Sequence, residues 1–173
     1  MLAGALRELY DYNRRATEHV LDVAAKLTPE QWLAPGNAGR GSIRDTLVHQ
    51  ISAHKGWLAW WDGSLTAEMA RRRADVSNFP DVASVRAFWS TVEQSTQAFV
   101  DGLTDADVER VYSRPTPDGG IWRPALWQMM LHVANHGTQH RSEVAAMLTQ
   151  FGHSPGDLDA INFFRPAGDV STG

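Results

Sequence analysis

The stretch that most constrains the fold of this chain runs from Leu126 to Phe151, LWQMMLHVANHGTQHRSEVAAMLTQF. At about 100° per residue, its apolar side chains share one face of a helix. These positions are Leu126, Met129, Met130, Val133, Val144, Met147, Leu148 and Phe151. The pattern predicts a long amphipathic helix, and the apolar face of such a helix has to be buried against other elements.

Three histidines follow one another at intervals of four residues in this predicted helix: His132, His136 and His140. His140 lies close to the centre of the apolar face, His136 about 60° from it, and His132 at the flank, about 100° away. Imidazoles one turn apart can reach a single metal ion. The alternative is a pair of core histidines bonded to neighbouring carbonyl groups, because this spacing also occurs by chance. A metal site needs a third ligand from elsewhere in the chain.

The composition is that of an ordinary globular protein and excludes several kinds of site. The chain has 173 residues, enough for one domain with a proper core, and 43% of them are hydrophobic. It has no cysteine, which excludes disulfides, thiolate metal ligands and a cysteine nucleophile. A net charge of −4 argues against a nucleic-acid surface, and no apolar run reaches the roughly 20 residues of a membrane span. We expect a cytoplasmic protein.

Two further helices are predicted in the first third of the chain. Residues 2–27 follow the 3.6-residue period, and Thr28 and Pro29 then end that helix and begin a short helical turn. Ser42 is expected to cap the next helix, which runs to about Asp62 and carries two adjacent apolar stripes. A helix that is apolar over so wide an arc has neighbours on two sides, as in a four-helix bundle.

Each stripe of the helix at 42–62 contains one histidine, so His49 and His54 are both expected to point inward. Either one can complete a metal site with His136 and His140. The helical wheel places His54 nearer to the centre of the main stripe, but this does not decide between the two.

The rest of the chain completes an all-α four-helix bundle with a long crossover between its second and third helices. Residues 64–80, which include the basic run Arg71 to Arg73, are long enough to let these two helices run parallel. Asp81 is expected to cap the third helix, which ends near Asp101. Residues 111–122 read as an extended strap around a turn.

The fourth helix is expected to contain Pro124 in its first turn and to end before Gly152. Apolar residues at 158–164 are expected to return to the bundle. We place one domain at residues 1–165 and a flexible C-terminal tail at 166–173.

Two motifs resemble those of the DinB-like family. The segment LHVANHGTQHRSEV resembles its helix-four pattern of Asn-His, three residues, His-Arg, and SIRDTLVHQISAH resembles its second signature. The resemblance covers nearly the whole chain and implies an up-down-down-up bundle. It also implies that His49, His136 and His140 bind one divalent metal ion, usually zinc or nickel. Family members often have His and Gly-Gln where this chain has Gln139 and Ser142-Glu143, so the surroundings of the site differ.

Five further polar residues are candidates for roles near these ligands. His54 is expected in the core or just behind the ligands, and Glu143 is either an acid or base that lies behind the ligands or a solvated side chain. His132 is expected near the mouth of the site. Asn135 and Arg141 are expected to join neighbouring helices through hydrogen bonds and a salt bridge.

Three imidazoles on a divalent ion leave positions for water or substrate, which is the open arrangement of a catalytic site. Characterised members of the family that this chain resembles include transferases that use a low-molecular-weight thiol, and metal-dependent hydrolases. The resemblance therefore implies an enzyme acting on a small molecule, and such bundles commonly pair as homodimers. The alternative is a non-catalytic metal-binding or stress-associated protein. A pocket of several hundred Å³ beside the ion favours the enzyme, and a sealed site favours the alternative.

Overall fold

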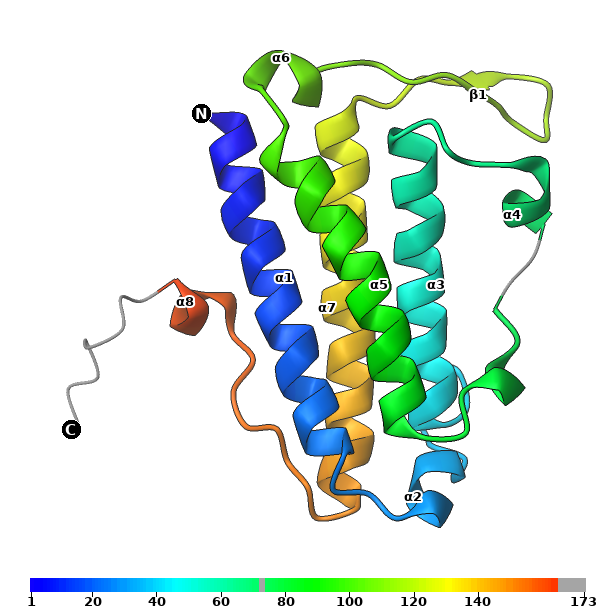
Figure 1. Cartoon of the computed structure of the whole chain (residues 1–173), viewed down its shortest axis with the longest axis vertical. Coiled ribbons are helices and arrows are strands. Elements are labelled where there is room, and N and C mark those ends of the chain that lie inside the picture. Colours follow the sequence, from blue (N-terminus) through cyan, green and yellow to red (C-terminus); the bar gives the residue numbers. More distant parts are fainter. Residues whose placement is uncertain (72–73, 165–173) are drawn as a thin grey trace.

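The structure is a computed structural model that describes residues 1–71 and 74–164. Four long helices form a bundle: α1 (Leu2–Ala24), α3 (Ile43–Trp61), α5 (Val82–Asp101) and α7 (Leu126–Gln150). Figure 1 shows α1 and α7 running in one direction and α3 and α5 in the other, and α1 and α3 each pack against both α5 and α7. The predicted all-α bundle with parallel second and third helices is confirmed.

Several helices begin at the capping residues that the sequence predicts. The Ser42 hydroxyl accepts a hydrogen bond from the N–H of Asp45 at the start of α3. Asp81 and Ser84 form a reciprocal capping box at the start of α5. Thr28 caps the short helix α2 (Pro29–Leu33), which follows α1. These N-caps agree with the predicted positions.

The prediction that Pro124 lies inside α7 is wrong, because the helix begins at Leu126 after its N-cap Ala125. The strap before the helix explains the difference. The Tyr112 N–H donates to the Pro124 carbonyl at 2.9 Å, and Val111 and Ala125 form an antiparallel bridge. This pairing holds Pro124 and Ala125 in an extended conformation.

The connections contain several short elements. The crossover from α3 to α5 includes α4 (Ala67–Arg71) and a 3-10 helix, η1 (Val76–Asn78), while residues 72 and 73 lie outside the described residues. After α5 come α6 (Asp105–Val108) and the two strands of the strap, β1 (Arg114–Pro115) and β2 (Ile121–Trp122), which pair antiparallel. The strap crosses the end of the bundle at which α7 begins, at the top of Figure 1.

The C-terminal segment returns to α1 as predicted and ends in α8 (Ala160–Phe163). The Tyr12 hydroxyl donates to the Leu158 carbonyl at 3.1 Å, and the rings of Tyr12 and Phe163 lie 5.2 Å apart. Arg15 donates to the Phe163 carbonyl at 2.9 Å. The tail predicted at 166–173 lies outside the described residues.

The interior of the bundle has two apolar clusters separated by a layer of buried polar residues. One cluster lies toward α2 and includes Leu21, Leu47, Trp89 and Met147. The other lies toward the strap and includes Leu6, Leu58, Leu126 and Met130. Between them, each long helix contributes to what we call the polar belt, consisting of Asn13, Thr17, Gln50, His54, Glu93, Thr96, His140 and Arg141. Within the described part of the chain, no helix has the length and apolarity needed to cross a membrane.

Candidate metal centre

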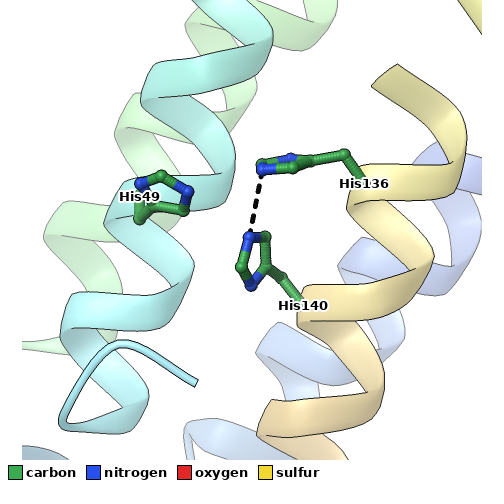
Figure 2. Close-up of side chains that lie close together, drawn as sticks. All are labelled: His49, His136 and His140. Atoms are coloured by element: carbon green, nitrogen blue, oxygen red, sulfur yellow. Dashed lines mark hydrogen bonds between the residues drawn. The ribbon is translucent and has the colours of Figure 1, made fainter. Parts of the chain in front are cut away.

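Helices α3 and α7 bring three histidines together near the polar belt. His136 and His140 lie one turn apart on α7, and His49 faces them from α3 (Figure 2). The ring centre of His49 lies 5.3 Å from that of His136 and 4.8 Å from that of His140. The ring centres of His136 and His140 are 4.3 Å apart. These are the three residues that the family resemblance implied.

The arrangement of the three rings is suited to a metal ion. One nitrogen from each ring lies within 4.8 Å of the other two. Zinc–imidazole bonds are about 2.0–2.1 Å long, so two nitrogens on one ion lie roughly 3–4 Å apart, and a small rotation of the rings reaches that spacing. Imidazole is a good ligand for zinc, nickel, copper and iron. The donor set of His49, His136 and His140 therefore fits one divalent transition metal ion.

Glu143 orients His140 within this cluster. Its carboxylate lies 2.6 Å from His140 Nδ1 and also accepts a hydrogen bond from Gln139 Nε2 at 3.1 Å. With Nδ1–H donating to Glu143, a neutral His140 presents the lone pair of Nε2 to the cluster, where His136 Nε2 lies 3.0 Å away. Carboxylates hold metal-binding histidines in this way in many proteins. Gln139 and Glu143 are two of the positions at which this sequence departs from the family pattern.

The electrostatic surroundings keep His136 in the form that binds metal. Burial lowers the pKa of His136 to about 4, and the neighbouring charges of His140, His49, His132 and Arg40 add to this effect. Partial burial alone would raise the pKa of Glu143, but the hydrogen bonds from Gln139 and His140 and the positive charge of Arg40 lower it below its ordinary value. Near neutral pH, His136 is thus a neutral ligand and Glu143 an ionised acceptor.

His54 lies apart from the three histidines and belongs to the core. It is 4% exposed, and its Nε2 lies 3.1 Å from the hydroxyl of Thr96, which donates its own proton to the Val92 carbonyl. The His54 ring therefore donates from Nε2, and it makes edge contacts with the rings of Tyr10 and Trp89. Burial lowers the pKa of His54 to about 4, with contributions from the charges of Arg141 and His136.

The remaining candidates on α7 point in different directions. His132 is exposed, with its ring 5.9 Å from that of His136 and 5.1 Å from that of Trp57. Asn135 is also exposed. Arg141 is buried and joins α7 to α1, but its partners are neutral oxygens. The expected salt bridge of Arg141 is not found among the described side chains.

A glycine-rich loop holds Arg40 beside the cluster. Gly39 has a φ of +69°, and a Cβ there would lie 2.4 Å from the Thr46 hydroxyl, so only glycine fits without strain. The Arg40 N–H donates to that hydroxyl at 2.9 Å, which fixes the loop on α3. A cavity of about 580 Å³ opens here and is lined by His49, Arg40, Asp45 and other residues of α3 and the crossover.

The strap places residues near the cavity at His49, and the sequence patterns did not indicate these residues. The Trp122 ring lies 6.2 Å from the Trp57 ring and 5.8 Å from the Trp60 ring, and the Arg114 guanidinium lies 5.6 Å from Trp60. Trp57, Trp60 and Arg114 line a smaller cavity of about 250 Å³. It shares lining residues with the cavity at His49, so the two adjoin. No pattern in the strap signals this contact, because it depends on how the strap crosses α3.

Comparison with known proteins places the chain in a family. The model of the DinB family matches residues 1–170. The chain is also similar to Protein DinB of Bacillus subtilis (strain 168), with 21% identity over 153 residues that cover 88% of this chain and 89% of that protein. The match extends across all four long helices, including the segments that carry His49, His136 and His140. The chain belongs to the DinB family.

Proposed function

We propose that this protein is a metal-dependent enzyme that acts on a small molecule, either as an S-transferase with a low-molecular-weight thiol cosubstrate or as a hydrolase. His49, His136 and His140 hold one divalent ion, with zinc and nickel as the preferred candidates. The observation that carries the proposal is the convergence of three imidazoles beside a cavity of about 580 Å³, of which His49 forms part of the wall.

The chemistry follows from what each residue contributes. When bound, a divalent ion supplies Lewis acidity, which lowers the pKa of a water or thiol in its open position toward neutrality. The chain has no cysteine, so a thiol nucleophile has to arrive as a cosubstrate. Glu143 holds the proton on His140 Nδ1 and so keeps Nε2 directed at the cluster.

The residues that line the cavity indicate which kind of substrate it favours. Arg40 is exposed at the cavity, and its positive charge favours a substrate or thiol that carries a negative group. Trp57 and Trp60 provide aromatic surface in the adjoining cavity, where a flat or apolar group can pack. Together they favour a substrate with an anionic end near Arg40 and an apolar part toward the strap.

The competing function is a non-catalytic metal-binding or stress-associated protein. A site of that kind needs no space for a substrate, and closed structural metal sites are filled by four protein ligands. The cluster here offers three, and the cavity reaches His49 from solvent. Both observations support the enzyme over the competing function.

The first test is metal content by elemental analysis of protein purified without chelator or histidine tag. We expect one zinc or nickel ion per chain in the wild type and less than about a tenth of that in His49→Ala. His132→Ala is the matched control, because His132 is a neighbouring exposed histidine outside the cluster, and it should retain the ion. Equal metal content in all three proteins would contradict the assignment.

The second test measures turnover on metal-loaded protein. Cysteine, glutathione and coenzyme A are each combined with 1-chloro-2,4-dinitrobenzene to detect thiol transfer, and p-nitrophenyl acetate is used to detect hydrolysis. We expect one of the two reactions to depend on added metal and to be lost in His49→Ala but not in His132→Ala. A fully loaded protein that catalyses neither reaction would favour the non-catalytic alternative.

A further inference from the structure

A further cavity lies on a different face of α7 from the histidine cluster. Its volume is about 550 Å³, and it is bounded by α1, α7 and the segment at 156–160 that leads into α8. None of the three clustered histidines lines it. A volume of this size is within the range of small-molecule sites, which span about 300–1,000 Å³.

The wall of this cavity contains a buried cation. Arg141 is 1% exposed, and its Nη1 donates to Asn13 Oδ1 at 2.5 Å and to the Thr17 hydroxyl at 3.3 Å. Its Nη2 donates to the Thr138 hydroxyl at 3.0 Å, and its guanidinium lies 5.3 Å from the centre of the Tyr12 ring. All three acceptors are neutral. Among the described side chains, no carboxylate pairs with Arg141 and none accepts a hydrogen bond from its Nε.

A buried guanidinium with an unused donor favours an anion. The group has five N–H donors and keeps its charge at physiological pH, and a buried charge without a counter-charge is costly. A carboxylate can neutralise the charge and accept from the remaining donors in one step, because its two oxygens match the planar guanidinium.

The rest of the cavity limits what kind of anion fits. Leu9, Leu131 and Leu158 make part of its lining apolar. Asp157 and Asp159 lie in the same wall and are exposed, so a ligand with several negative charges would be repelled there. These features select a ligand with one negative charge and an apolar body.

The outer wall of the cavity is held in place by α1. The Tyr12 hydroxyl donates to the Leu158 carbonyl, and His19 Nε2 lies 2.7 Å from the Pro155 carbonyl oxygen. Asp157 accepts hydrogen bonds from the Asp159 N–H at 2.8 Å and from Asn162 at 2.7 Å, which order the turn at 157–162. The cavity therefore has fixed sides on α1, α7 and the C-terminal segment.

We propose that this cavity is a second binding site, which takes a small monocarboxylate with an apolar body and seats its carboxylate on Arg141. The site is separate from the histidine cluster and does not depend on the metal. The probe is 4-methylpentanoate, titrated into the full-length protein in an isothermal calorimeter. Its neutral analogue 4-methylpentan-1-ol and inorganic phosphate are titrated in parallel. We expect 4-methylpentanoate to bind at least tenfold more tightly than either, and equal or absent binding of all three would overturn the proposal.

Variants locate the bound carboxylate. Ala145 lines the cavity, and Ala145→Trp is expected to fill it and weaken binding at least tenfold with Arg141 intact. Ala146→Trp is the matched control, because Ala146 is the next residue, is exposed and lies outside the cavity. Arg141→Lys should also weaken binding. His49→Ala should bind as the wild type does. Loss of binding in His49→Ala with normal binding in Ala145→Trp would place the carboxylate at the histidine cluster and refute the proposal.

Discussion

Glu93 is an acidic side chain in the polar belt of the bundle, and its burial predicts that the stability of the protein depends on pH. It is 8% exposed, and burial raises its pKa from the ordinary 4.5 to about 8. The charge of Arg14 on α1 lowers this pKa, but those of Glu18 and Asp11 raise it. The pKa of Tyr10 is raised by its own burial and by the charge of Glu93. Glu93 therefore remains largely protonated in the folded protein at pH 7.

The sign and size of the effect on stability follow from proton linkage. As the pH rises above 4.5, the unfolded chain loses the Glu93 proton while the folded protein keeps it, so the free energy of unfolding falls until the pH reaches about 8. At about 1.4 kcal/mol per pH unit, the loss at pH 7 is roughly 3 kcal/mol. Glu93→Gln has the shape of the protonated acid and removes this loss. The variant should match the wild type within about 1 kcal/mol at pH 5 and exceed it by about 3 kcal/mol at pH 7.

The assay is urea unfolding followed by circular dichroism at pH 5, 6 and 7. The difference between Glu93→Gln and the wild type isolates Glu93, because His54, with its own lowered pKa, contributes equally to both proteins. Glu109→Gln, which removes an exposed carboxylate, is the control and should leave the pH dependence unchanged. A difference between Glu93→Gln and the wild type that stays constant from pH 5 to 7, or a less stable variant at pH 7, would refute the reasoning.

Three other substitutions test the site and the packing. Glu143→Gln removes the acceptor that orients His140 and should weaken metal affinity by about 10–100-fold, measured by competition with a chelating dye; unchanged affinity would show that the contact is not needed. Gly137→Ala places a Cβ 2.6 Å from Asn13 Oδ1 and should lower the free energy of unfolding by about 1–3 kcal/mol in thermal melts. In Gly56→Ala, the added Cβ meets open space within α3, and the free energy of unfolding should rise by about 1 kcal/mol. Destabilisation by both glycine substitutions would contradict the packing described.

The helices could be predicted from the sequence because the signals that define them are local. Ser42 and Asp81 cap their helices through contacts with residues three positions away. Such pairs are visible in the sequence itself. The long crossover at 64–80 likewise indicated that α3 and α5 run parallel. The start of α7 could not be placed in the same way, because Pro124 is held extended by Tyr112 of the strap.

The third histidine of the cluster shows why the centre of an apolar stripe is a poor guide to a site between two helices. In a four-helix bundle, that centre points toward the common interior, and positions at its flank face the neighbouring helix. His54 occupies the centre and bonds to Thr96 of α5, while His49 lies at the flank and faces α7. The family resemblance, not the helical wheel, indicated His49.

The hydrogen bonds from Arg141 to a neighbouring helix were predicted, but its partners could not be, for a different reason. Its partners Asn13 and Thr17 lie on α1, more than a hundred positions away in the sequence, and are neutral residues that no charge pattern singles out. Gly137, in the same motif, is explained by this network as well, because a side chain there would collide with Asn13 and Arg141.

The C-terminal segment allows the Arg141 cavity to diverge independently of the histidine cluster. The histidine cluster is built on α3 and α7, inside the bundle, where a change of one side chain disturbs several neighbours. The outer wall of the Arg141 cavity comes from residues 156–160, which follow the last long helix and pack against α1. Insertions or substitutions there can reshape one cavity while the bundle and the cluster stay as they are. A single scaffold can thereby keep the histidine cluster unchanged while the shape and charge of the Arg141 cavity vary.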